Sequence, residues 1–572
     1  MTTTNDSSLG FVDELVGRLP AAETTWARTS LTQRAELLGR FAALVDQHAE
    51  QWALTGARIK GIPADSEMMG EEWIGGPWAI LAYVEALKST LEVLAAGGDP
   101  LEKVAMSPAP GGRIALQVLP HTTFDKLLLN GFRAEVWTEP GVTAAELRDR
   151  VGLTQREPHV TFGSCFVLGA GNVTSCAPSD VLYQLFAENR VVVLKLNPVM
   201  DAVKPVFDAV FAPFIELGVV QIVTGGVDVG EALAHHPGIS AVHMTGSEAT
   251  HDAVVWGVGD EGKIAKATGQ PRLGKPMTSE LGGVSPVIVV PGEWSKADLR
   301  FQARHIATLR LQNSGSNCVA AQVVILSSDW SQKEEFLGEL RAAMKAAPKR
   351  IPWYPGTEKR VQDARTSYPA AEAIGGTPER TLITGLNLDD PGEPAFHCEY
   401  FGPVLGVAEL PGTGQQFLDR AVAVSNERLH GTLGANILIH PKTRRALGDS
   451  LLRAITALRY GTISINCWTG VGYLSPTAPW GAFPGHRLDD IQSGIGVIHN
   501  ALLLPATERT IVSGPFRPFP RSVLHGEMAL APTPPWFIDH RNAAKTARKL
   551  ASFAAKPRWR ALPGIVAAAM RG

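Results

Sequence analysis

Hydrophobic residues in the first hundred positions recur at intervals of three and four, which is the spacing of amphipathic helices. Residues 31–48 (LTQRAELLGRFAALVDQH) show this pattern, with charged side chains filling the gaps. We therefore expect residues 11 to about 110 to form a packed helical region without catalytic residues.

From about residue 160 short β-branched runs alternate with helical segments. The expected strands are 160–169, 191–196, 219–223, 241–244 and 286–290, and the helices between them are 179–189, 201–217 and 229–236. Such alternation predicts a parallel sheet wound by right-handed crossovers, the usual scaffold for a dinucleotide.

A second series of the same kind follows and predicts a second lobe. Its expected helices are 296–311 and 331–346, and its strands are 321–326, 433–439 and 462–466. Residues 506–513 (ATERTIVS) alternate in the manner of an edge strand. Beyond Gly514 the chain is rich in proline, and from His540 onward it carries eight Lys or Arg and no Asp or Glu.

Composition excludes several classes of protein. The 53 basic and 56 acidic residues give a net charge of −3, and 45% of the residues are hydrophobic, so general disorder is excluded and no overall attraction to nucleic acid is expected. The five cysteines are scattered without a C-x-x-C pair, which argues against a disulfide framework and a zinc site. The polar N-terminus and the absence of a long uncharged apolar run predict a soluble, cytoplasmic protein, and the scattered cysteines predict no metal site.

Three side chains are candidates for chemistry. Cys318 lies on an Asn-Ser-Gly-Ser-Asn turn that can expose a thiol, although taken alone it is more typical of a small buried hydrophobe. Glu280 stands before a Gly-Gly pair and an apolar strand, as a general base or as a surface cap. Glu399 is presented by a Gly-Pro turn together with Phe401, or is simply solvated.

Small and polar residues end four consecutive strands. Gly169-Ala-Gly171-Asn172 follows the first, although the third glycine of the dinucleotide fingerprint is missing and a plain tight turn explains it too. Lys195 ends the second strand, Gly225-Gly226 follows the third, and Thr245-Gly246-Ser247 ends the fourth. Because these strands end at one edge of the predicted sheet, they predict one crevice for a dinucleotide.

In this order the motifs resemble the aldehyde dehydrogenase superfamily. The resemblance runs from about Pro158 to Ser513, and the Asn172 to Lys195 interval, 195 − 172 = 23, matches the family. The further motifs are MTGS at 244–247, ELGG at 280–283, GSNC at 315–318, EYFGPV at 399–404, IN at 465–466, PWG at 479–481 and SGIG at 493–496.

The resemblance implies a role for each matched residue. Cys318 would attack the aldehyde, Asn172 would stabilise the oxyanion, and Glu280 would activate the water that hydrolyses the thioester. The implied cofactor is NAD or NADP, bound by Lys195, Gly225, Gly246, Ser247, Glu399 and Phe401.

Departures from the family pattern leave the choice of cofactor and the identity of the substrate open. Pro198 stands where many members have a Glu for the adenine ribose, so the choice between NAD and NADP stays open. Ser316, Gly171 and the Pro479–Ala482 segment also depart, which affects the pocket and the substrate. Trp468, Tyr473 and Trp480 border the expected substrate entrance and favour an apolar or aromatic aldehyde.

The implied fold is α/β, aldehyde dehydrogenase-like, with two wound parallel-sheet lobes and a small oligomerisation segment. We assign 1–140 to the helical part of the cofactor-binding lobe, 141–159 to a candidate oligomerisation segment, 160–283 to the dinucleotide-binding domain, 284–500 to the catalytic domain, 501–514 to an oligomerisation strand and 515–572 to a Pro-rich, basic extension. A homodimer or homotetramer is expected. The extension would wrap a neighbouring subunit or, less favoured, touch a membrane surface.

The leading functional hypothesis is NAD(P)-dependent oxidation of an unspecified aldehyde to a carboxylic acid. One alternative is the acyl-transfer branch of the superfamily, in which CoA takes the acyl group or an acyl thioester is reduced. The other is a non-catalytic binding protein with this fold, which the joint presence of Cys318, Glu280, Asn172 and Lys195 disfavours.

Overall fold

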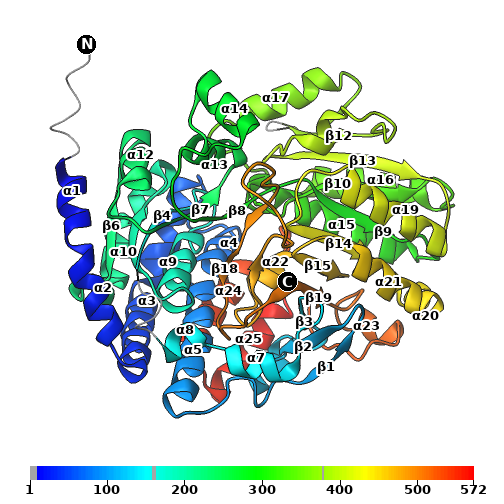
Figure 1. Cartoon of the computed structure of the whole chain (residues 1–572). Helices are drawn as coiled ribbons and strands as arrows, with labels where there is room; N and C mark the ends of the chain where they lie inside the picture. Colours follow the sequence, from blue (N-terminus) through cyan, green and yellow to red (C-terminus); the bar gives the residue numbers. More distant parts are fainter. Residues whose placement is uncertain (1–9, 158–162, 377–378) are drawn as a thin grey trace.

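The computed structural model describes residues 10–157, 163–376 and 379–572. Within these residues the chain is an α/β protein of two lobes, each built on its own sheet, and the two lobes lie on opposite sides of Figure 1. The predicted fold class is therefore confirmed.

The N-terminal region is helical, as its periodicity predicts. Its elements are α1 (Gly10–Gly17), α2 (Leu19–Arg28), α3 (Leu31–Ile59), α4 (Met69–Trp73), the π-helix η1 (Ile74–Trp78) and α5 (Ala79–Ala95). The predicted helix 31–48 is confirmed and continues to Ile59. It begins where Ser30 and Gln33 form a capping box, in which each side chain accepts from the other's backbone N–H.

The first lobe contains, in the described part of the chain, a six-stranded sheet in the order β17-β8-β7-β4-β5-β6. Its strands are β4 (Ser164–Leu168), β5 (Val191–Lys195), β6 (Val220–Val223), β7 (Ala241–Gly246), β8 (Met277–Leu281) and β17 (Gly494–Ile495). The strands from β4 to β8 pair in parallel, and β17 pairs antiparallel with β8. The chain order reverses at β4, so the loop after β4 opens at the topological switch point.

The three helices predicted for this lobe are present, one of them divided, and two further helices after β7 were not predicted. The helices observed are α9 (Cys176–Phe186), η2 (Pro198–Val203), α10 (Lys204–Val210), α11 (Ala212–Glu216), α12 (Val227–His235), α13 (Glu248–Val255) and α14 (Gly259–Thr268). The single helix predicted over 201–217 is three short ones, because Pro205 and Pro213 each stand in the first turn of a new helix. The beginning of the predicted strand 160–169 lies outside the described residues.

The second lobe contains a sheet that has eleven strands within the described residues, in the order β1-β2-β3-β19-β15-β14-β9-β10-β13-β12-β11. The strands are β1 (Met106–Ala109), β2 (Arg113–Leu119), β3 (Arg133–Thr138), β9 (Ser285–Val289), β10 (Ala321–Ser327), β11 (Glu372–Ile374), β12 (Arg380–Ile383), β13 (Val404–Leu410), β14 (Gly434–Leu438), β15 (Thr462–Ile465) and β19 (Thr507–Ser513). A short pair, β16 (Trp480–Gly481) and β18 (Val497–His499), lies apart from it. The predicted strands of this lobe are confirmed.

The remaining helices pack on this lobe or join its strands. They are α6 (Thr123–Leu128), α7 (Ala144–Arg150), α8 (Leu153–Arg156), α15 (Lys296–Leu311), η3 (Gln312–Gly315), α16 (Lys333–Ala346), α17 (Thr357–Ser367), α18 (Pro394–His397), α19 (Gly414–Glu427), α20 (Pro441–Leu447), α21 (Asp449–Ala457) and α22 (Gly470–Tyr473). Both helices predicted here, 296–311 and 331–346, are present as α15 and α16.

The assignment of residues 1–140 to a helical part of the cofactor lobe is wrong for its last third. Strands β1, β2 and β3 lie there and join the sheet of the other lobe through β19. These strands are short and are separated by loops and α6, so their alternation of hydrophobic and polar residues is weaker than the helical periodicity of the preceding residues.

The expectation that 506–513 forms an edge strand is also wrong. β19 lies inside the sheet, pairing in parallel with β15 and antiparallel with β3. Residues Glu508–Val512 are all buried, so the alternation in the sequence does not mark a solvent face. Because both of its hydrogen-bonding edges are occupied within the chain, β19 is not available for pairing with another subunit.

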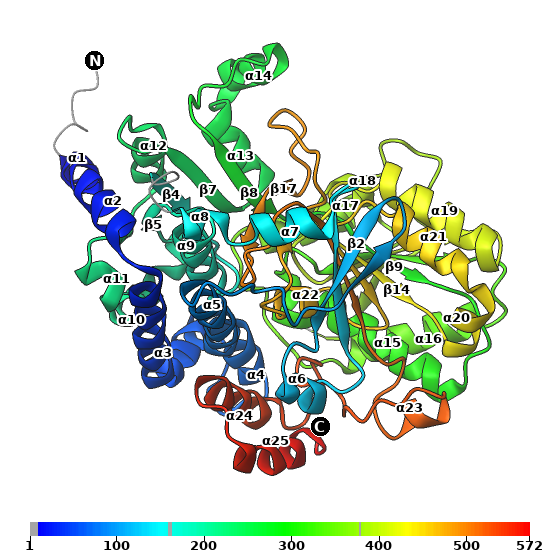
Figure 2. The same cartoon turned by 60° about the horizontal axis from the view of Figure 1, so that its bottom comes forward.

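The C-terminal extension packs against its own chain, and contact with a neighbouring subunit stays a prediction. It forms α23 (Arg521–Leu524), α24 (Ala543–Ala555), the 3-10 helix η4 (Trp559–Ala561) and α25 (Leu562–Ala569). In Figures 1 and 2 α24 lies beside α4, with α25 on its outer side. The helices among the described residues are all too short or too polar to span a bilayer.

We expect Thr510→Pro to destabilise the chain by about 3 kcal/mol or more, because Thr510 lies in the middle of β19 and its N–H donates to the Gly461 carbonyl oxygen (2.8 Å). Urea unfolding measures the loss, and Thr510→Ser, which keeps the N–H, is the control. Wild-type stability in the proline variant would mean that β19 is an edge strand after all.

Candidate active site

Cys318 lies just beyond a turn with an unusual backbone. Asn313, Ser314 and Gly315 have φ values of 54°, 57° and 77° in succession, and the first two are not glycine. Such left-handed residues persist only where the surroundings hold them. The Asn313 side chain provides part of that hold, since its Nδ2 donates to the carbonyl oxygens of Asn172 and Ser316 at 3.0 Å each and to Asn317 Oδ1 at 3.1 Å. The turn therefore leaves Cys318 partly open to a cavity at the junction of the two lobes.

Glu280 contacts Cys318 from the other lobe. It is carried by β8, is 2% exposed, and its carboxyl group accepts a hydrogen bond from the Cys318 thiol. Trp480 Nε1 donates to Glu280 Oε1 at 3.1 Å. Burial raises the pKa of Glu280 to about 7, against the lowering effect of these two hydrogen bonds. Glu280 is thus a carboxyl group that exchanges protons near neutral pH.

The thiol is perturbed in the same direction. Burial and the neighbouring Glu280 charge raise the pKa of Cys318 well above its usual range. A thiol of this kind stays protonated at neutral pH until a base removes its proton. Glu280 is the base in contact with it.

Asn172 completes the group. It follows β4 at the switch point, is 8% exposed, and its Nδ2 donates to the Ser316 carbonyl oxygen at 3.1 Å. This bond ties the Asn172 side chain to the peptide two residues before Cys318, and the amide has a second N–H to donate. The structure therefore brings Asn172, Glu280 and Cys318 together, although they are far apart in the sequence.

A cavity of about 70 Å³ opens beside these three residues. Trp468, Tyr473 and Trp480 line it, as the sequence predicts for a substrate entrance. The wall also includes a buried ion pair, Lys60 Nζ to Glu72 Oε1 at 2.8 Å, which sequence reasoning missed. The cavity wall is thus mainly apolar and contains one buried pair of opposite charges, Lys60 and Glu72.

The predicted cofactor residues lie along the carboxyl edge of the first sheet. Lys195 is the last residue of β5, Gly225 follows β6, and Gly246 ends β7. Ser247 caps α13, where its Oγ accepts from the Thr250 N–H at 3.3 Å. Since β7, β4, β5 and β6 are parallel neighbours, their ends form the single edge that the sequence predicts.

Lys195 is 6% exposed and burial lowers its pKa. Asp201 and Asp228 counteract that lowering, so both carboxylates lie close enough to act on the ammonium group. Asp201 was not singled out from the sequence. The sequence pointed to it only by proximity, because it lies six residues beyond Lys195, in the 3-10 helix η2 that follows β5.

Glu399, on the second lobe, lies against Gly282 and Gly283, which follow β8 of the first sheet. It is buried, accepts a hydrogen bond from the Gly283 N–H, and its Oε1 has no partner within the described part of the chain. Burial raises the pKa of Glu399 to about 7. A Cβ at Gly282 would come within 2.1 Å of Glu399 Oε1, so only glycine leaves room there. An unpaired carboxylate oxygen in a glycine-lined recess fits the hydroxyl donors of a cofactor ribose.

Phe401 is held apart from the three central residues. It has φ 44°, and its ring meets Tyr354 edge-on with centroids 4.9 Å apart. It borders Glu399 in the chain but is not a lining residue of the cavity beside Cys318.

One cluster elsewhere has the composition of a metal site. Asp298, His440 and His525 place possible ligand atoms within 4.8 Å of one another. Arg517 Nη1 lies 2.6 Å from Asp298 Oδ1, so the carboxylate is already paired with a cation and a metal ion would meet a guanidinium group. This cluster anchors the C-terminal extension to the start of α15.

Comparisons with known proteins agree with this geometry. The model of the aldehyde dehydrogenase family matches residues 132–358. An N-succinylglutamate 5-semialdehyde dehydrogenase of Novosphingobium aromaticivorans is 24% identical over 451 residues, which are 75% of this chain and 79% of that protein.

Solved structures show the same fold. The aldehyde dehydrogenase KauB from Pseudomonas aeruginosa aligns with a TM-score of 0.59 and 19% identity over 88% of this chain and 89% of its own. The NADP-dependent glyceraldehyde-3-phosphate dehydrogenase from Bacillus halodurans, solved with NADP, aligns with a TM-score of 0.58 and 19% identity over 88% and 91%.

We expect Glu280→Gln to lower the pKa of the Cys318 thiol, because the substitution removes the negative charge that opposes ionisation. The pH dependence of iodoacetamide alkylation, followed by mass spectrometry of the Cys318 peptide, measures the shift. Cys398, which is exposed, serves as the internal reference. An unchanged or higher alkylation pKa in the variant would contradict the contact.

Proposed function

The chain belongs to the aldehyde dehydrogenase superfamily, and on that premise we propose that it oxidises an aldehyde to a carboxylic acid with NAD or NADP as the oxidant. The observation that carries the proposal is the contact between the Cys318 thiol and the Glu280 carboxyl group, beside a cavity and next to a dinucleotide edge. A nucleophile, a base and an oxyanion donor converge there.

The first half of the reaction forms a bond to sulfur. Glu280 takes the thiol proton, and the Cys318 sulfur attacks the carbonyl carbon to give a tetrahedral thiohemiacetal. The negative charge that develops on the carbonyl oxygen is stabilised by Asn172 Nδ2 and by the Cys318 backbone N–H. Bound NAD or NADP supplies the hydride acceptor that turns this adduct into a thioester.

The second half removes the acyl group. Glu280, ionised again, takes a proton from water, whose oxygen attacks the thioester carbon. The carbon–sulfur bond breaks, the carboxylic acid leaves, and the sulfur regains a proton. Because the pKa of Glu280 is about 7, the same carboxyl group can accept and release protons at each stage near neutral pH.

The cofactor would be held by Lys195 and Glu399 at its two riboses, with Gly225, Gly246 and Ser247 along the edge. Asp201 and Asp228 add negative charge near Lys195, which favours a free ribose hydroxyl over a 2′-phosphate. This supports NAD over NADP.

Two alternatives are tested by the same assay. In one, CoA rather than water takes the acyl group. The presence of Glu280 beside Cys318 disfavours this alternative, because a general base at that position activates water for hydrolysis of the thioester. In the other, the chain only binds ligands, which the convergence of Cys318, Glu280 and Asn172 disfavours. The cytoplasmic location and the homodimer or homotetramer remain predictions.

We expect NADH formation with one or more members of a panel of short, long-chain, aromatic and carboxylated aldehydes, and its loss in Cys318→Ala. Absorbance of the reduced cofactor is followed with NAD and NADP, with and without CoA. Cys467→Ala, a change of a buried cysteine elsewhere, is the matched control. Turnover that survives in Cys318→Ala would overturn the mechanism, and turnover that requires CoA would select the acyl-transfer branch.

We expect activity to rise with pH through about 7, because Glu280 must be ionised to act as a base. Trp480→Phe removes a hydrogen bond that lowers this pKa, so the rising limb should move to higher pH. Trp468→Phe is the matched control, because Trp468 lines the same cavity but does not donate to Glu280. A limb that moves equally in both variants would contradict the assignment to Glu280.

A further inference from the structure

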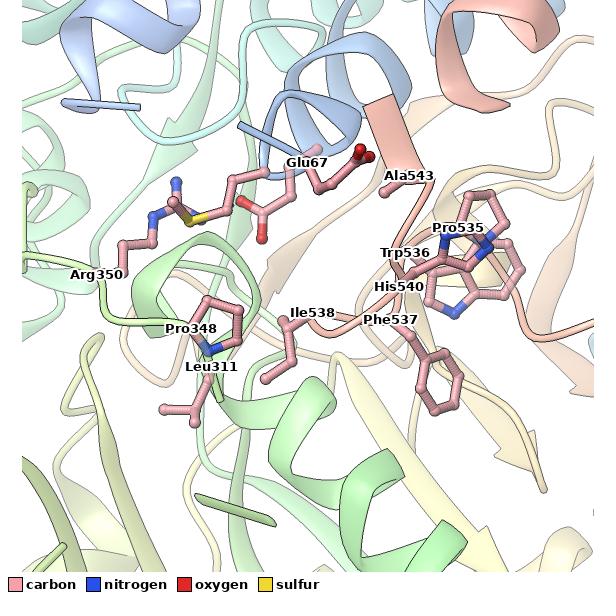
Figure 3. A pocket seen from close by; sticks show the side chains of 12 residues that line it. Glu67, Leu311, Pro348, Arg350, Pro535, Trp536, Phe537, Ile538, His540 and Ala543 are labelled. Atoms are coloured by element: carbon pink, nitrogen blue, oxygen red, sulfur yellow. Dashed lines mark hydrogen bonds and ion pairs between the residues drawn. The ribbon is translucent and has the colours of Figure 1, made fainter. Parts of the chain in front are cut away.

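The C-terminal extension meets the rest of the chain close to the candidate active site. Figure 3 shows a small cavity where residues 535–538, His540 and Ala543 lie opposite Glu67 and Arg350. Its volume of about 30 Å³ holds about one water molecule, so it is a seam rather than a ligand site. Glu71 lines both this seam and the cavity beside Cys318.

On one side of the seam α24 packs closely on α4. A Cβ at Gly70 would lie 2.8 Å from Ala543 Cβ and 2.9 Å from the Ala543 carbonyl carbon, so the backbones approach without space for a side chain. The Ala544 N–H donates to Glu67 Oε2 at 3.0 Å. Ala547 and Ala551 are fully buried in a cluster with Met69 and Trp73. The small-residue face of α24 thus fixes the position of α4.

On the other side the extension runs along α15. Gln302 Nε2 donates to the Phe516 carbonyl oxygen at 2.6 Å, and Arg304 pairs with Asp539 at 2.6 Å. The Phe537 ring stacks on Phe301, with centroids 5.4 Å apart. Since α15 ends at Leu311 and leads directly into the left-handed turn, the extension holds the element that precedes Cys318.

Glu71 joins these two contacts to the turn. Both oxygens of its carboxylate lie 3.2 Å from the Asn313 backbone nitrogen. Arg350 pairs with Glu71, and its Nη2 donates to Asn313 Oδ1 at 3.4 Å. The Arg350 and Glu71 side chains are only 9% and 10% exposed, so this contact is shielded from water.

Asn313 is the residue on which these bonds converge. Its backbone accepts a left-handed conformation that costs free energy, and its side chain holds Asn172, Ser316 and Asn317. Loss of the Glu71 contact removes a charged acceptor from a strained peptide five residues before the nucleophile.

We propose that Glu71 and Arg350 are positioning residues for Cys318, acting through Asn313, and that the C-terminal extension holds α4 and α15 so that they do so. The effect on turnover rests on the proposed function. The effect on thiol reactivity does not, because alkylation of Cys318 requires neither aldehyde nor cofactor.

The experiment compares Glu71→Ala, Glu71→Gln, Arg350→Gln and Gly70→Ala in the full chain. Lys556→Gln is the matched control, since it breaks an ion pair to Asp46 made by the residue that directly follows α24. Four quantities are measured: kcat, KM for the aldehyde, the rate of Cys318 alkylation and the binding of NAD(P)H by quenching of Trp fluorescence. Circular dichroism and thermal unfolding report the folded fraction.

We expect Glu71→Ala to lower kcat by about 10- to 100-fold and to change the alkylation rate, with cofactor binding and the folded fraction unchanged. Glu71→Gln should fall between wild type and Glu71→Ala, because its amide oxygen still accepts from the Asn313 N–H. Arg350→Gln should add little to Glu71→Ala when the two are combined, since they act through one residue. Gly70→Ala should lower kcat without touching any of these side chains, and Lys556→Gln should match wild type.

Wild-type kcat and alkylation in Glu71→Ala would overturn the positioning role, as would losses that only follow the folded fraction. Wild-type behaviour of Gly70→Ala would overturn the role of the extension. If the wild-type protein oxidises no aldehyde in the panel, the proposed function fails, and the alkylation rates alone decide this inference.

Discussion

The site depends on one buried contact across two lobes, between the Glu280 carboxyl group and the Cys318 thiol. Glu280 is fixed by β8 of the first sheet, and Cys318 by the turn before β10 of the second. Neither residue has chemistry to offer alone, because an isolated buried thiol is inert and an isolated buried carboxyl group has no partner to deprotonate. The two-lobe architecture therefore brings the two side chains to hydrogen-bonding distance and shields them from bulk water.

Burial makes the carboxyl group a better proton acceptor and the thiol a weaker proton donor. It raises the pKa of both groups, which leaves the thiol protonated at rest and brings the carboxyl group to about 7, where it accepts protons readily. Trp480 lowers the pKa of Glu280 from one side, and the charge of Glu280 opposes ionisation of Cys318 from the other. In the proposed mechanism, reactivity is therefore set by proton transfer within the pair and arises only when a carbonyl group is present to react with the sulfur.

Much of this could be predicted from the sequence, and the failures have a physical cause. Asn172 and Lys195 were singled out at the ends of predicted strands, and Cys318 and Glu280 from short motifs, whereas their roles rest on the resemblance to a family. The place of β19 could not be predicted, since its neighbour β3 lies more than three hundred residues earlier in the chain and alternation is the same for an edge strand and for one that is covered. The docking of α24 was missed for a similar reason: an alanine-rich face fits any close surface, and only Gly70 identifies which one.

The central claim is that Cys318 carries the acyl group and Glu280 releases it. The most direct measurement is intact-protein mass spectrometry of Glu280→Gln mixed with NAD and an aldehyde that the wild-type protein oxidises, at a pH high enough for the Cys318 thiol of the variant to ionise without the missing base. The account predicts one equivalent of NADH in a burst, an added mass equal to the acyl group on Cys318, and its disappearance on treatment with hydroxylamine. Steady turnover without any adduct on Cys318 would contradict it.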